Sequence, residues 1–66
     1  MKIFGTRLRE VRKSKKLTQQ NLADILNIKR ATIAKWETGK NEPSFENLIK
    51  LADLFEVSLD WLFGRE

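Results

Sequence analysis

Residues 17–40, LTQQNLADILNIKRATIAKWETGK, decide the fold. Their apolar residues recur at helical spacing, without the sustained period-two alternation of a strand. Thr18 is a good N-cap for a first helix, although Asn21 stands where a complete capping box has Glu or Gln. Asn27 tolerates a positive φ, so it is expected to end that helix as a left-handed cap. The stretch therefore predicts two short helices joined by a tight turn.

The second helix of this pair is expected to begin near Lys29, a poor N-cap, and to end at Gly39 as its C′ residue. Ile33, Trp36 and Glu37 share one face through their i, i+3, i+4 spacing. The opposite face carries Ala31, Ala34, Lys35 and Thr38, with Arg30 in the first turn. One face of the helix is therefore core-like, and the other is small and basic.

Three further helical segments flank the pair. Before it, apolar residues at i, i+4 and i+7 predict a helix that ends near Lys15. After it, Ser44 caps a helix with a long apolar stripe, which is expected to be the central core helix. The stripe consists of Phe45, Leu48, Ile49, Ala52 and Phe55, widened by Leu51 and Leu54. A short last helix over residues 59–63 lies between a Ser58 cap and Gly64, which makes the chain all-α with five helices.

Composition limits the function classes. The chain has 66 residues, a formal net charge of +4 and neither His nor Cys. We expect one domain, residues 1–66, with no disulfide, no metal and no cofactor. Enzymatic chemistry is disfavoured because the usual general base and thiolate nucleophile are missing. The acidic residues Asp53, Glu56 and Asp60 are expected to form a solvated face rather than catalytic carboxylates.

Charge is divided unevenly along the chain. Residues 1–40 carry 11 Lys or Arg against 3 acidic residues, a charge of +8, whereas residues 41–66 carry 2 against 6, a charge of −4. This division suggests that one half faces a polyanion and the other faces solvent or a partner. A randomly charged, solvated surface is the alternative. No signal peptide or membrane span is recognisable, so a cytoplasmic, nucleoid-associated location without a membrane partner is expected.

Three residues determine how the two middle helices meet. Ala23 lies on the inner face of the first helix, where a larger side chain would hold the helices apart. Ile28 in the turn and Ile33 on the second helix are placed to fill the angle between them. This is helix-turn-helix geometry, in which the second helix enters the major groove of DNA.

Four segments carry a specific resemblance to a known family. They are residues 17–23 (LTQQNLA), 32–40 (TIAKWETGK), 43–48 (PSFENL) and 57–62 (VSLDWL). In this order and spacing they resemble the phage-repressor, Cro and XRE-like helix-turn-helix family, over about residues 4–63. The resemblance implies a compact, lambda-repressor-like five-helix bundle that binds double-stranded DNA sequence-specifically, usually as a homodimer on a palindromic operator. The chain departs from the family at Asn27, where Gly is common, and at Lys29, where Ser or Thr is common.

Arg12 and Glu37 match, by this resemblance, a pair that commonly joins the first helix to the end of the recognition helix. The residue pattern is compatible, because Glu37 shares a face with Ile33 and Trp36, and a buried carboxylate needs a partner. We therefore expect a partly buried ion pair. The alternative is an exposed Glu37 near a helix end.

Base contacts are expected on the small basic face of residues 30–38. Arg and Lys can bond the O6 and N7 edge of guanine, and an Ala methyl can touch the thymine methyl. The candidates for base contact are Arg30, Ala31, Ala34 and Lys35. For Arg30 and Lys35 the alternative is phosphate contact or plain solvation. The phosphate candidates are Gln19, Gln20, Thr32, Thr38, Lys40 and Asn41.

The two tryptophans have different expected roles. Trp36 lies beside Ile33, so a core position is expected rather than a stacking platform for single-stranded nucleic acid. Trp61 lies off the face that the last helix buries, which makes it a candidate for contact with a second copy. The proposed dimer residues are Leu59, Trp61 and Phe63. The alternative for Trp61 is a half-buried position across its own bundle.

Two function hypotheses remain. The first is a transcriptional regulator, a repressor or Cro-like protein, that inserts residues 30–38 into the major groove of an operator. Its expected partners are double-stranded DNA and a second copy, with no small-molecule ligand. The second hypothesis is an antitoxin-like or protein-interaction module that keeps the fold without operator readout.

Overall fold

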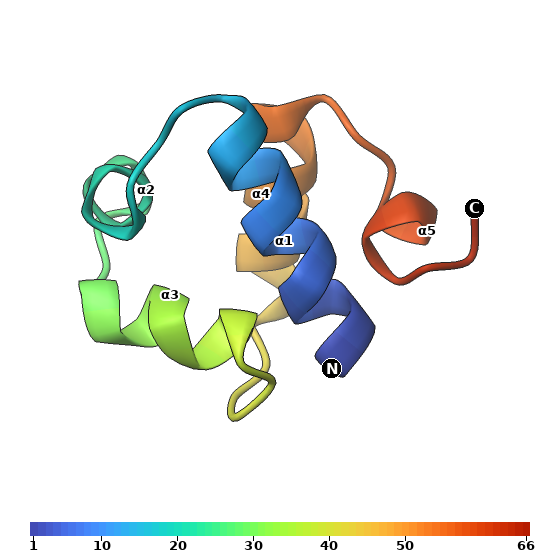
Figure 1. Ribbon diagram of the computed structural model, residues 1–66, viewed down its shortest axis with the longest axis horizontal. Helices are drawn as coiled ribbons and strands as arrows, with labels where there is room; N and C mark the ends of the chain where they lie inside the picture. Colours follow the sequence, from blue (N-terminus) through green and yellow to red (C-terminus); the bar gives the residue numbers. More distant parts are fainter.

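Five helices and no strands make up the protein, and the computed structural model describes all residues, 1–66. The helices are α1 (Lys2–Ser14), α2 (Gln19–Leu26), α3 (Arg30–Glu37), α4 (Phe45–Phe55) and α5 (Leu59–Leu62). In Figure 1, α1 crosses in front of α4, with α2 and α3 on one side and α5 on the other. α3 packs against α1 and α2, while α5 packs against α1 and α4. The all-α, five-helix prediction is confirmed, and none of the helices is long and apolar enough to cross a membrane.

Local capping rules account for the two middle helices. The Thr18 Oγ1 accepts a hydrogen bond from the Asn21 N–H at 2.9 Å, and the Thr18 N–H donates to the Asn21 Oδ1 at 3.0 Å. Asn21 therefore completes a capping box despite its shorter side chain. Asn27 ends α2 at φ 57° and ψ 47°, the predicted left-handed cap, while Lys29 begins α3 without a side-chain cap. These two ends fix the tight turn between α2 and α3.

The buried face of α4 differs from the predicted stripe. Leu48, Leu51, Ala52 and Phe55 are buried, at the i, i+3, i+4, i+7 spacing of one helix face. Phe45, Ile49 and Leu54 are instead 72%, 37% and 37% exposed, so their assignment to the core stripe was wrong. Phe45 and Ile49 lie along one edge of the buried stripe and Leu54 along the other, where the turn of the helix carries their side chains towards solvent. The apolar pattern alone could not distinguish the stripe that is buried from the broader stripe that was predicted.

Gly5 allows α1 to approach the end of α3 more closely than any other amino acid at this position would. A Cβ atom at this position would lie 2.5 Å from the carbonyl oxygen of Glu37 and 2.6 Å from that of Trp36. Both neighbours are backbone atoms, which cannot move aside as a flexible side chain can. The absence of a side chain at Gly5 therefore sets the distance between the two helices.

We predict that Gly5→Ala destabilises the protein, although Ala is favoured over Gly by about 1 kcal/mol inside an exposed helix. Overpacking of a close contact costs about 1–3 kcal/mol, and here the contact is with rigid backbone. Urea unfolding followed by circular dichroism measures the change in the free energy of unfolding. The neighbouring, exposed Thr6→Ala serves as control and is expected to change it by less than about 0.5 kcal/mol. An equal or greater stability of Gly5→Ala would contradict this close approach.

Candidate nucleic-acid interface

A bidentate ion pair ties α1 to the end of α3. The Nε of Arg12 lies 2.7 Å from the Oε2 of Glu37, and its Nη2 lies 3.2 Å from the Oε1. The Nη1 of Arg12 also donates to the carbonyl oxygen of Leu17 at 2.7 Å, in the loop before α2. The two side chains are only 8% and 4% exposed, so Glu37 is not the exposed residue of the alternative interpretation. The pair therefore joins the helix-turn-helix unit to the rest of the bundle.

The two glutamines that open α2 have different surroundings. Gln19 is half-buried, and its Nε2 donates to the Oε1 of Glu37 at 3.1 Å. The Oε1 of Gln19 accepts from the Nη1 of Arg30 at 3.2 Å. Gln20 is exposed, and its Nε2 bonds Asp24 within the same helix at 2.8 Å. Of the two phosphate candidates, Gln20 thus faces solvent, whereas the Gln19 amide is engaged within the protein.

The opposite sides of α3 differ as predicted from the spacing. Ile33 and Trp36 are buried in the core, so Trp36 is not available as a stacking platform. Ala34 and Thr32 are half-buried beside the outer face. The exposed residues of that face are Arg30, Ala31, Lys35 and Thr38. This face combines small side chains in its middle with two long cations, which suits close approach to a polyanion.

The remaining phosphate candidates lie at the C-terminal end of α3. Lys40 and Asn41 are exposed in the loop before α4. Thr38 is exposed as well, but its hydroxyl donates to the carbonyl oxygen of Ala34 at 3.1 Å. That hydroxyl proton is therefore committed to the helix. The side chains of Lys40 and Asn41 form no hydrogen bond within the protein, so their donors are available.

The aromatic residues near the C-terminus pack on their own chain. Trp61 is half-buried, and the guanidinium of Arg7 lies 4.6 Å from the centre of its ring. Arg7 also donates through Nη1 to the carbonyl oxygen of Trp61 at 3.1 Å. The ring of Phe63 lies 5.9 Å from that of Phe4. The alternative for Trp61, a half-buried position across its own bundle, is the arrangement found.

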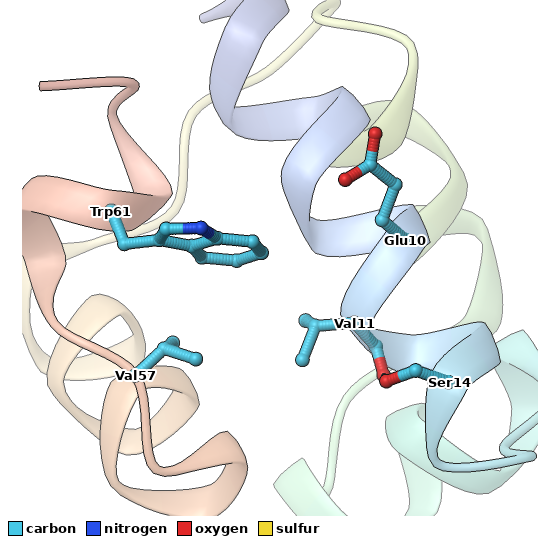
Figure 2. A pocket seen from close by; sticks show the side chains of 5 residues that line it. All are labelled: Glu10, Val11, Ser14, Val57 and Trp61. Atoms are coloured by element: carbon cyan, nitrogen blue, oxygen red, sulfur yellow. The ribbon is translucent and has the colours of Figure 1, made fainter. Parts of the chain in front are cut away.

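The contact between Arg7 and Trp61 could not be found from the sequence. The two residues are 54 positions apart, and neither belongs to a local pattern that indicates the other. A shallow hollow of about 260 Å³ lies beside this contact, between α1 and α5. Figure 2 shows the Trp61 indole extending towards α1, with Val57 and Val11 below it and Glu10 above. The apolar side chains of Val11, Val57 and Trp61 therefore line a hollow that is open to solvent.

Comparison with known proteins assigns the family. The model of a helix-turn-helix family matches residues 8–62, and the chain belongs to this family. It is 48% identical over 60 residues to the HTH-type transcriptional regulator AnsR of Bacillus subtilis, covering 91% of this chain and 52% of that protein. It is 42% identical over 59 residues to the cryptic phage CTXphi transcriptional repressor RstR of Vibrio cholerae, covering 89% and 53%. The chain thus spans about half the length of these curated relatives.

A solved structure extends the similarity to the whole fold. The P22 c2 repressor, crystallised in complex with a synthetic operator, matches with a TM-score of 0.88 and 30% identity. The match covers all of this chain and all of that one. The lambda-repressor-like arrangement expected from the sequence is therefore confirmed.

We predict that breaking the buried pair is costly and that removing both partners is less so. Glu37→Leu leaves the Arg12 guanidinium buried without a counter-ion, which costs about 3–5 kcal/mol, and Arg12→Met does the same to Glu37. The double variant should lose less stability than the two single losses together. Urea unfolding of all four proteins gives the coupling energy, with Arg9→Met, at an exposed position of α1, as control. Additive losses would contradict a direct interaction between the two side chains.

Proposed function

We propose that the chain is a sequence-specific, double-stranded DNA-binding transcriptional regulator of the repressor or Cro type. The observation that carries the proposal is the exposed, small and basic face of α3 on a fold shared with a repressor crystallised on its operator. The relatives AnsR and RstR, a transcriptional regulator and a transcriptional repressor, support the same class of function. A binding role is proposed and no catalytic one, because the chain has neither His nor Cys.

In this proposal, residues 30–38 enter the major groove. Ala31 and Ala34 let the helix lie close to the base edges and can contact thymine methyl groups. Arg30 and Lys35 reach the O6 and N7 edge of guanine from either end of this small surface. The phosphate contacts come from Gln20, Lys40, Asn41 and the half-buried Thr32. Such contacts fix the register of the helix without specifying sequence.

The charge distribution supports this orientation. Residues 1–40, which form α1 to α3, carry +8, and residues 41–66, with α4 and α5, carry −4. The acidic residue at the end of α3, Glu37, is compensated by Arg12 within the bundle. The DNA would therefore meet the basic half, with the acidic half turned away from it. A protein that acts on DNA in this way would be associated with the nucleoid.

We further propose that residues 1–66 form one DNA-binding domain and that two copies bind together. Leu59, Trp61 and Phe63 are half-buried, and the apolar hollow beside Trp61 offers additional contact area. A two-fold pair would present two α3 helices to half-sites about 34 Å apart, which makes the operator palindromic. The packing of Trp61 on Arg7 leaves Leu59 as the residue of choice for testing this surface.

The first test is a selection of bound sites from random double-stranded DNA, followed by fluorescence titration at several salt concentrations. We predict one enriched site and an affinity that falls with salt, with a logarithmic slope of about 0.9 per phosphate contact. The double variant Arg30→Ala/Lys35→Ala should lose the site preference while remaining folded. Lys50→Ala, which removes an exposed cation from α4, is the matched control and should bind as the unaltered protein does. A folded protein with no preferred site would favour the protein-interaction module instead.

The second test concerns the dimer. We predict that Leu59→Glu weakens binding to a full palindrome by roughly 100-fold, because the two half-sites lose their avidity. Its affinity for an isolated half-site should remain unchanged. Sedimentation on operator DNA counts the copies bound, and Leu54→Glu, at an exposed position on α4, is the control. If two copies of the Leu59→Glu variant bind the palindrome with undiminished affinity, α5 is ruled out as the contact surface.

A further inference from the structure

The outer side of α1 carries a row of exposed cations. Lys2, Arg9 and Lys13 follow one another at i, i+7 and i+11, so they share one face of the helix. The single acidic residue of α1, Glu10, lies beside this row, where it lines the hollow next to α5 (Figure 2). The row itself contains no negative charge, and we name it the basic face.

The basic face has no counter-charge within the protein. The pair of Arg12 and Glu37 is the only salt bridge in the structure, so the three cations of the basic face are all unpaired. Arg9 and Lys13 are moreover like charges at i, i+4, an arrangement that destabilises a helix. A negatively charged surface outside the molecule would offset this repulsion.

The outer side of α4 carries the opposite charge. Glu46 and Asp53 are exposed at i and i+7, and neither takes part in a salt bridge. They belong to the acidic half of the chain, residues 41–66, whose charge is −4. We name these two carboxylates the acidic face. Like the basic face, it has no partner within the protein.

The two faces point in opposite directions. The buried stripes of α1 and α4 belong to one core, which lies between the two helices. Each outer face is directed away from that core, and Figure 1 shows α1 at the front of the molecule with α4 behind it. One copy therefore cannot bring its basic face against its own acidic face, whereas two stacked copies can.

The charges on the two faces have matching spacings. Seven residues separate Lys2 from Arg9 and likewise Glu46 from Asp53, which corresponds to about 10 Å along each helix axis. Both carboxylates can therefore meet a cation at the same time, whether the two helices run parallel or antiparallel. Two simultaneous contacts define how the copies lie relative to each other, which a single exposed ion pair does not.

The residues between these charges are compatible with such a contact. Lys50 lies midway along the acidic face, and the corresponding position of the basic face holds the uncharged Thr6, so two cations do not meet there. Ile49, at the edge of the acidic face, is 37% exposed and can be covered by the hydrocarbon stems of the long cationic side chains. The contact would thus combine ion pairs with burial of apolar surface.

We propose that the basic face of α1 binds the acidic face of α4 of a second copy of this chain. The contact is head-to-tail, so the pair keeps one free face of each kind and further copies can add. It is separate from the two-fold contact proposed at α5, and it requires no DNA. Exposed ion pairs are individually weak and screened by salt, so the association is strongest at low ionic strength or where DNA holds copies close together.

The test compares two charge-reversed variants by sedimentation equilibrium without DNA, at about 0.05 M and about 0.5 M salt, which differ about threefold in screening length. Lys2→Glu/Arg9→Glu makes the basic face negative, and Glu46→Lys/Asp53→Lys makes the acidic face positive. Circular dichroism and urea unfolding establish that each variant is folded under these conditions.

At the lower salt concentration, the unaltered protein should form species larger than two copies, whose mean mass rises with protein concentration and falls at the higher salt concentration. Either variant alone should associate about tenfold more weakly, because two exposed ion pairs are lost. An equimolar mixture of the two should regain the association, since one variant is then negative where the other is positive.

A control separates this contact from a change in net charge. Lys15→Glu/Lys29→Glu reverses two exposed cations that lie outside both faces, so it alters the net charge as much as the variant of the basic face does. This control should associate as the unaltered protein does. A loss of association equal to that of the basic-face variant would mean that net charge alone is responsible.

Three other results would overturn the inference. If either face variant associates as strongly as the unaltered protein, that face takes no part. If association stops at two copies and Leu59→Glu abolishes it, the two-fold contact at α5 accounts for it. If the unaltered protein stays monomeric while Lys2→Glu/Arg9→Glu lowers the salt dependence of DNA affinity, the basic face binds DNA instead. None of these outcomes decides the proposed function, which is tested by site selection on DNA.

Discussion

The buried pair of Arg12 and Glu37 is the interaction on which the arrangement of the other helices depends. Its guanidinium bonds a carboxylate at the end of α3 and a backbone carbonyl in the loop before α2. One side chain of α1 thus holds both ends of the helix-turn-helix unit. Gly5, about two turns earlier in α1, allows the backbone of α3 to come close enough for this contact. Without the pair, packing of α3 on α1 would rest on apolar contacts alone.

Burying two charges in so small a protein carries a desolvation penalty. A core of 13 apolar side chains in 66 residues leaves a modest net stability, and no disulfide supplements it. The bidentate geometry and the additional bonds to Leu17 and Gln19 offset that penalty, because each donor or acceptor at the centre of the pair has a partner. Apolar residues could provide similar stability, but they could not orient an amide or reach an exposed arginine. The hydrogen bonds that run from Arg12 through Glu37 and Gln19 to Arg30 therefore connect stability with the outer face of α3.

The local elements followed predictably from residue chemistry. Thr18 and Asn27 define the ends of α2 through a hydroxyl acceptor and a tolerated positive φ, both of which depend on a few neighbouring residues. The outer face of α3 could equally be predicted, since helical spacing separates its small and basic residues from Ile33 and Trp36. The stripe on α4 was predicted less well, because Phe45 and Ile49 fit the period yet lie at the edge of the buried face. Periodicity predicts which side of a helix is buried, but it does not decide whether a residue at the edge of that side is buried or exposed.

The sequence by itself determined five helices, the caps Thr18, Asn27, Ser44 and Ser58, the uneven charge and the family of the fold. Each of these depends on neighbouring residues or on a motif of fixed spacing. Only the tertiary structure decided that Gly5 touches the end of α3, that Arg7 covers Trp61, and that Gln19 joins Glu37 to Arg30. The physical reason is that hydrogen bonds and ring contacts act over a few ångströms, whereas these partners lie up to 54 positions apart in the chain. Their directions become defined when the helices are packed, since a helix face can be inferred from spacing but the rotamer that meets a distant partner cannot.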